Sequence, residues 1–271
     1  MTDAPRSQTA LPSLEPAATI DDVLARIDAV VQWSIAGASR LGYFAALYKR
    51  ITRAVKAGIA AGRFADGARM ERLDVAFANR YLDALNGYFA RTAQPAASAC
   101  WRVAFDGASL SGPGVVQHML AGVNAHIGLD LAIAAVQIAR PAPLSDLHSD
   151  FDEINVILAE QLGAVLDEID RISPVLADLY DVFKKYELTT LADGLVVIRD
   201  DAWRFAEVLA LEPELIRSPT IAGRDVLTAA AGMNVLHPPP PVGAVAAGIT
   251  AREATDISSN IRILDDIASS G

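Results

Sequence analysis

Apolar residues recur at helical spacing along most of the chain, and residues 115–140 are apolar on nearly every side. Their sequence, VVQHMLAGVNAHIGLDLAIAAVQIAR, has no internal proline. A helix that is apolar all round is a buried one. The pattern therefore predicts a long central helix over 115–140, inside a single all-α multi-helix bundle.

Amphipathic segments on both sides of residues 115–140 predict the helices that cover it. Thr19 stands where an N-cap residue is expected, with acidic residues in the turn that follows. We find no internal repeat and no alternating strand pattern, which also favours an all-α fold. Besides 115–140, helices are predicted over residues 20–40, 41–61, 70–91, 148–172, 175–187, 189–212 and 222–231, with 92–114 as a connection.

The ends of the chain differ in composition from its middle. Residues 1–18 are polar and contain prolines, which predicts a disordered leader without the apolar segment of a signal peptide. Residues 19–235 form the predicted helical domain. Residues 236–271 contain the proline run Pro238–Pro241 near their start, which predicts a stiff spacer followed by a tail that can form a peripheral helix. Cytoplasmic residence is the default expectation for such a chain.

Charge and cysteine content exclude several classes of protein. The net charge is −10 and the pI near 4.8, which argues against a general nucleic-acid or anionic-membrane surface. With Cys100 as the single cysteine, neither an internal disulfide nor a cysteine-based metal cluster can form. We expect a small-molecule ligand or substrate as the partner, and nothing in the sequence selects an oligomeric state.

The central segment is also long enough to cross a membrane. His118, His126 and Asp130 would then lie in mid-span, where ionisable groups are costly. We therefore expect a helix buried in protein and no membrane span.

The candidate site lies on this central segment. His126 and Asp130 are i and i+4 neighbours on one helix face, and His118 lies two turns earlier, about 80° away at 100° per residue. Asn124 falls off that arc and is expected to cap, bridge or pack, or to contact substrate. Buried imidazoles and carboxylates need partners. Three interpretations stay open: an acid–base couple, a zinc or iron site made by His126, Asp130 and His118, or a buried polar pair that ties helices together.

Residues outside the central segment are weaker candidates for the site. Asp150 begins the next predicted helix and is interpreted as a cap or as a substrate-binding residue. Trp203 and Arg199 lie on a later helix and have two interpretations. Either both line the pocket, or Trp203 packs in the core and Arg199 is a surface charge. Asp74 and Arg80 are expected to be solvated or bridged to other helices. Phosphate-binding loops, nucleophile elbows, paired Glu-x-x-His motifs and aspartate-rich cyclase clusters are absent from the sequence.

The run HMLAGVNAHIGLDLA resembles the hallmark of an uncharacterised bacterial family, a domain of unknown function with an N-A-H-I-N-x-D-L core. The segments YFAALYKRITRAV, MERLDVAFANRYLDAL, DFDEINVIL and RDDAWRFAEVLA resemble its other blocks, so the resemblance covers about 43–211. One departure is Gly128, where the family motif usually has a second asparagine. The resemblance implies a polar site at His118, Asn124, His126 and Asp130, with weaker matches at Asp74, Arg80, Asp150, Asn155 and Trp203.

Two functions follow as hypotheses. The first is an enzyme that acts on a small, largely apolar molecule inside the bundle, as a lyase, cyclase, isomerase or hydrolase, with His126, Asp130 and His118 as catalytic groups. The alternative is a non-catalytic protein that binds a hydrophobic small molecule in the same pocket. A purely structural role for the polar residues is the third possibility.

Overall fold

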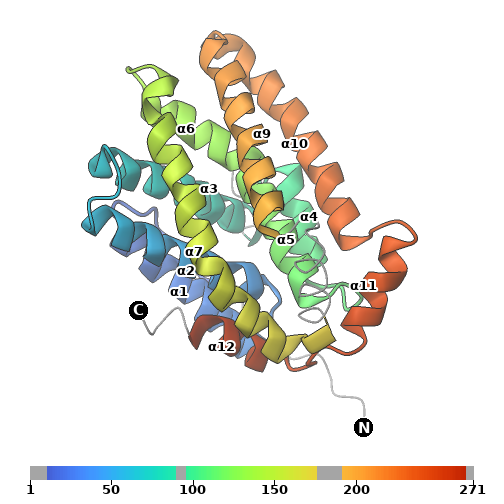
Figure 1. Cartoon of the computed structure of the whole chain (residues 1–271). Helices are drawn as coiled ribbons and strands as arrows, with labels where there is room; N and C mark the ends of the chain where they lie inside the picture. The colour runs from blue at the N-terminus through green and yellow to red at the C-terminus, as the bar shows by residue number, and fades with distance from the viewer. Residues whose placement is uncertain (1–10, 90–95, 176–190, 267–271) are drawn as a thin grey trace.

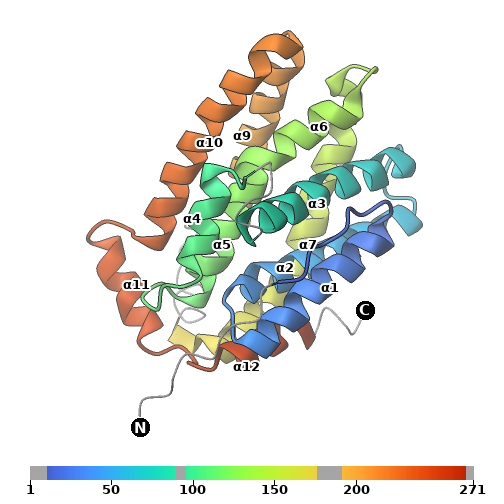
Figure 2. The ribbon, with the colours of Figure 1, turned by 180° about the vertical axis from the view of Figure 1, so that it is seen from behind.

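The computed structural model describes residues 11–89, 96–175 and 191–266, and within these ranges it contains helices and no strand (Figure 1). The predicted all-α bundle around a buried central helix is confirmed. Helices α7 (His148–Ile172) and α9 (Leu191–Leu211) lie on the side of the bundle seen in Figure 1. Helices α3 (Gly67–Phe89) and α4 (Ala99–Gly107) lie on the opposite side, seen in Figure 2.

The first two helices form an antiparallel pair that the C-terminal helix joins. Helix α1 (Ile20–Gly37) begins with the predicted cap, because Thr19 and Asp22 bond each other's backbone in a capping box. Helix α2 (Leu41–Ala60) follows, and α12 (Ile257–Asp266) packs against both. Ile261 of α12 is fully buried, and Lys49 of α2 bonds both Asp28 and Asp265. The tail therefore contributes to the core.

The central helix is interrupted by one π-helical turn. It runs as α5 (Val115–Ala125), the π-helix η1 (His126–Leu131) and α6 (Ala132–Ala139). Gly122 allows a close approach to α2, because a Cβ there would lie 2.4 Å from the Phe44 ring. Helices α2, α3, α4 and α9 surround the central helix together with α10 (Glu214–Leu236). A π turn inside an α-helix is rare and is frequent at functional sites.

The central helix is also, in the part of the chain that the structure covers, the one helix long and apolar enough to cross a membrane. In its most apolar window, 83% is buried inside the protein. This burial is what a core helix requires, and length and composition alone are weak evidence for a span.

Other elements differ from the predicted boundaries. The predicted connection 92–114 contains α4, whose apolar side buries Trp101 and Phe105. Helix α10 is twice as long as predicted and contains Pro219, and α11 (Val242–Thr250) follows the proline run. A short 3-10 helix, η2 (Leu144–Leu147), precedes α7. The predicted helix over 175–187 lies almost wholly outside the described residues.

Part of the predicted leader packs against α3. Asn79 exchanges hydrogen bonds with the backbone of Ala17 and Asn86 with that of Leu14, at 2.8–2.9 Å. Leu14 and Ala17 are both buried. Residues 11–18 are therefore an ordered extended segment, since two asparagine amides satisfy their backbone groups. Residues 1–10 lie outside the described ranges.

Candidate functional site

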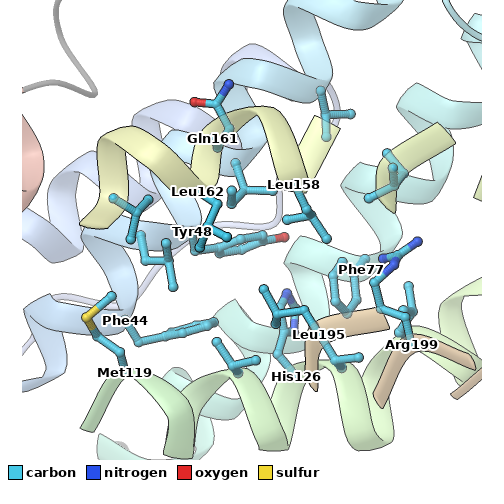
Figure 3. Close-up of a pocket in the computed structure, with 18 of the residues that line it drawn as sticks. Phe44, Tyr48, Phe77, Met119, His126, Leu158, Gln161, Leu162, Leu195 and Arg199 are labelled. Carbon is cyan, nitrogen blue, oxygen red and sulfur yellow. The ribbon is translucent and has the colours of Figure 1, made fainter. Parts of the chain in front are cut away.

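A cavity of about 170 Å³ lies between α2, α3, α7, α9 and the central helix (Figure 3). Leucine, isoleucine, valine, methionine and phenylalanine make up most of its wall. The polar side chains in the wall are those of Tyr48, Asp74, His126, Gln161 and Arg199. An apolar engineered cavity of ~150 Å³ stays dry and binds benzene, so this volume suits a small apolar molecule.

The cavity reaches the gap between α7 and α9. Leu158, Leu162 and Leu195 line it and also line a second, smaller hollow of about 30 Å³. All three side chains are only partly buried. The cavity and the smaller hollow therefore share a partly exposed wall between these two helices.

His126 is the polar group in the floor of the cavity, at the first position of η1. Its ring stacks on Phe77, with centroids 3.5 Å apart and planes 5° apart, and Tyr48 meets it edge-on at 4.6 Å. Burial lowers the pKa of His126, which favours the neutral imidazole. The aromatic contacts therefore hold the imidazole ring in place, and burial keeps it neutral. Its Nε2 is buried and left without a hydrogen-bond partner among the described residues.

Asp130 lies behind His126 and is almost fully buried. Arg80 donates to its Oδ1 at 2.6 Å, and the indole of Trp101 donates to its Oδ2 at 2.7 Å. His126 Nδ1 lies 3.5 Å from the same Oδ2, a long contact. A proton on Nδ1 would face this carboxylate, leaving the Nε2 lone pair for the cavity. The predicted His126–Asp130 couple is thus brought together, with two partners that hold Asp130 in place.

Asp74 lies in the cavity wall itself, unlike Asp130. Its Oδ2 is buried and has no hydrogen-bond partner among the described residues. Burial, helped by the charge of Glu71, raises the pKa of Asp74 to about 7. The pKa of the neighbouring Tyr48 phenol is raised well above its usual value, mainly by burial and then by the charges of Asp74 and Asp130. The cavity thus holds a carboxyl group that can exchange a proton near neutral pH.

The other side of η1 packs against α10. Asn124 Nδ2 donates to the Thr228 carbonyl at 2.8 Å, and Arg224 Nε donates to the Gly128 carbonyl at 2.7 Å. A Cβ on Gly128 would lie 3.0 Å from Thr228 Cγ2, so an asparagine at this position would face α10. Asn124 and Gly128 are absent from the cavity wall. The structure therefore gives both positions a packing role.

His118 lies apart from the cavity. It lines a small hollow of about 10 Å³ with Arg40, Phe44 and Trp101. Burial lowers the pKa of His118 to about 4. The helical offset of about 80° from His126 is enough to direct the two imidazoles to different neighbours.

Asp150 and Trp203 also lie outside the cavity wall. Asp150 accepts hydrogen bonds from the backbone N–H groups of Ala65 and Asp66, at 2.6 and 3.1 Å, just before α3. Trp203 donates to Glu207 and packs on Phe151. Asp150 therefore acts as a cap, but for the segment before α3 and not for its own helix.

The donor set of a metal site is incomplete in the described part of the chain. No group of three or more His, Cys, Asp or Glu side chains comes together there. His118 is separate from His126, and both oxygens of Asp130 already accept short hydrogen bonds. Of the three predicted zinc or iron ligands, His126 and Asp130 therefore lie together, whereas His118 is not brought to them.

Tyr48 and Phe77 were not among the predicted site residues, and Asp74 was only a weaker match of the family resemblance. Asp74 precedes Phe77 by three positions, so both lie on one side of α3, and that spacing was the available signal. Arg80 was expected to be solvated or bridged to another helix, and it binds Asp130 of the central helix. The packing of α2 and α3 determines which of these residues come into contact. Hydrophobic periodicity along the sequence does not predict that packing.

A family model described as a family of unknown function, DUF5995, matches residues 20–238. No curated protein matches the chain. No solved structure matches it either. The matched range contains every residue of the cavity wall and ends just after α10.

Proposed function

The chain belongs to DUF5995, a family of unknown function, and we propose that it binds a small, largely apolar molecule in the cavity and transfers a proton on it. One observation carries the proposal: His126 Nε2, in a mostly apolar wall, has no hydrogen-bond partner among the described residues. A native interior rarely leaves a buried polar atom unpaired without a functional reason. A ligand atom that bears a proton would satisfy this nitrogen.

The roles of the side chains follow from their surroundings. His126 accepts the proton at Nε2, and Asp130 stabilises the imidazolium that forms, across the Nδ1 contact of 3.5 Å. Arg80 and Trp101 hold Asp130 and act through it. Asp74, with a pKa near 7, is able to return a proton at a second atom. Removal at one atom and delivery at another is an isomerisation or an elimination.

The test uses 5-nitrobenzisoxazole, a small apolar molecule whose ring opens when a base removes its C–H proton. The proton goes to His126 Nε2, the N–O bond breaks, and the product is a coloured cyanophenolate. We expect the wild type to open the ring roughly 10²-fold faster than His126→Phe, a typical size for one acid–base group. The rate should fall when the medium is acidified enough to protonate His126.

His148→Phe is the matched control, because His148 is half-exposed on α7 and outside the cavity wall. It should react like the wild type. Equal rates in the wild type and His126→Phe would contradict proton transfer at this nitrogen.

A binding protein without catalysis is the second candidate, favoured by the mostly apolar wall. Saturable binding of octanol, a neutral apolar probe, together with no rate difference in the assay above, would select it.

A further inference from the structure

The cavity wall contains one permanent positive charge, the guanidinium of Arg199. This side chain belongs to α9 and is only 4% exposed. Burial lowers the pKa of Arg199 to about 10, so the group is still a cation at neutral pH. Within the protein the guanidinium donates hydrogen bonds to two residues of α7, Asn155 and Phe151.

The partners of Arg199 are all neutral. Its Nε donates to the Asn155 amide oxygen and its Nη2 to the Phe151 carbonyl, each at 2.6 Å. Its guanidinium carbon lies 4.3 Å from the centre of the Phe151 ring. Within the described ranges no carboxylate comes within ion-pair distance, and Nη1 makes no hydrogen bond. The acidic groups that act on it, Asp152 and Asp200, are both exposed.

A buried cation without an anion is costly. Other buried cations in this protein are paired: Lys49 with Asp265, and Arg50 with Glu168. These two buried cations are outside the cavity wall, and each is matched by a carboxylate. At Arg199 the neighbouring space is the cavity itself.

The position of Arg199 gives the cavity a polar end and an apolar end. Figure 3 shows Arg199 on one side of the cavity, Met119 and Phe44 on the other, and His126 between them. Met119 and His126 are seven residues apart on the central helix, or about 10 Å at 1.5 Å per residue. The wall beyond Arg199 and His126 offers aliphatic and aromatic side chains to the rest of a ligand.

We infer that the ligand of this cavity is an apolar carboxylate, whose carboxylate group binds Arg199 and whose hydrocarbon part extends past His126 toward Met119. The inference rests on the proposed binding function of the cavity and specifies its ligand class. Arginine suits a carboxylate because its planar fork can donate two parallel hydrogen bonds. Nη1 is the donor that the protein leaves free for it.

The experiment compares octanoate with octanol, which share the hydrocarbon chain and differ in the charged group. Binding of each is measured by calorimetry at neutral pH to the full chain, as wild type, Arg199→Met and Arg204→Met. Arg204 is the matched control, an exposed arginine on the same helix. We expect the wild type to prefer octanoate by roughly 10- to 100-fold, the range for a desolvated charge pair. Arg199→Met should lose that preference and keep octanol binding, and Arg204→Met should behave like the wild type.

The outcomes separate the two proposals. If octanol and octanoate bind the wild type equally and Arg199→Met changes neither, the carboxylate inference is overturned while the apolar cavity stands. If neither probe binds the wild type, the proposed binding function fails as well.

A second readout needs no variant and so survives if Arg199→Met does not fold. Octanoate labelled with ¹³C at its carboxyl carbon is titrated while bound to the wild type. A carboxylate beside Arg199 should have a lower pKa than free octanoate. A raised pKa would show burial in apolar surroundings without a cation and would overturn the inference.

Discussion

On the α10 side of η1, Asn124, Arg224 and Thr228 all make hydrogen bonds across the interface, whereas on the cavity side His126 Nε2 and Asp74 Oδ2 have no partner in the described chain. The central-helix residues on the two sides, Asn124 and Gly128 on one and His126 on the other, are all buried and lie within about one turn of each other. Hydrogen bonds therefore form where two helices meet and are missing where the wall faces open space.

The difference is the one expected between a packing interface and the binding surface that we propose. Other buried polar atoms also lack partners among the described residues, including the hydroxyls of Ser34 and Ser173 and both ring nitrogens of His118, and these residues do not line the cavity. In the cavity the unpaired atoms belong to titratable groups with shifted pKa values. Titratable groups with such shifts cluster at functional sites.

Three substitutions test the difference between the two sides of η1, and the one at Asp74 should change stability most. Its pKa is about 3.8 in the unfolded chain and about 7 in the folded one. Between these values the unfolded state loses a proton that the folded state keeps, so the free energy of unfolding falls as pH rises, by about 4 kcal/mol in all. Asp74→Asn should remove this loss. Urea unfolding of both proteins from pH 4 to pH 8 measures the difference.

The quantity compared is the difference in the free energy of unfolding between Asp74→Asn and wild type. Other titrating groups contribute to both proteins, so their contributions cancel in this difference. Asp170→Asn, at an exposed site on α7, serves as the control and should follow the wild type. A constant difference between Asp74→Asn and wild type across this pH range would show that the carboxyl is solvated.

A smaller effect is expected from Asp130→Asn, which removes the charge behind His126. Bonds to charged groups are worth about 1.5–3 kcal/mol, and Arg80 is one-third exposed, so a loss of about 2 kcal/mol is expected. Since Asp130 acts to raise the pKa of His126, the variant should also lower that pKa further. Urea unfolding and NMR titration of the imidazole check the two effects. An unchanged His126 pKa would argue that the 3.5 Å contact carries no coupling.

The smallest effect is expected from Gly128→Asn, which installs the asparagine that the family resemblance predicts at this position. The new Cβ lies 3.0 Å from Thr228 Cγ2, so the neighbouring α10 must give by a few tenths of an ångström, at a cost of about 1 kcal/mol. Octanol binding should be unchanged, because this position faces α10. Weaker octanol binding in a variant of normal stability would place the side chain in the cavity and remove the contrast between the two sides.

Much of the bundle follows from local pattern. The Thr19 capping box, the start of α2 at Leu41 and the burial of 115–140 depend on neighbours in sequence, so periodicity and capping preferences predict them. The pairing of His126 with Asp130 follows from i, i+4 spacing in the same way. These parts of the fold and of the site were predicted correctly.

The rest of the site depends on docking between distant helices. Asp130 meets Arg80 across 50 residues and Trp101 across 29. Asp74 of α3 lines a cavity whose other walls come from α2, α7, α9 and the central helix. Trp101 was placed in a connection, because the nine-residue helix α4 is too short for a clear periodic signal. His118 was grouped with His126 because both are buried on one segment, yet an angular offset of about 80° sends them to different neighbours.

The π turn also affects residue register. In a regular α-helix, one additional residue shifts everything after it by about 1.5 Å along the axis and about 100° around it. The wide turn absorbs this extra residue locally. Deleting Gly128 would therefore let the segment become a continuous α-helix while α6 keeps nearly its present rotational phase against α9. If all 25 residues of 115–139 became α-helical instead, α6 would turn by about 100° and present a different set of side chains to α9. The π turn is thus the feature that keeps the second half of the helix in phase with its neighbours.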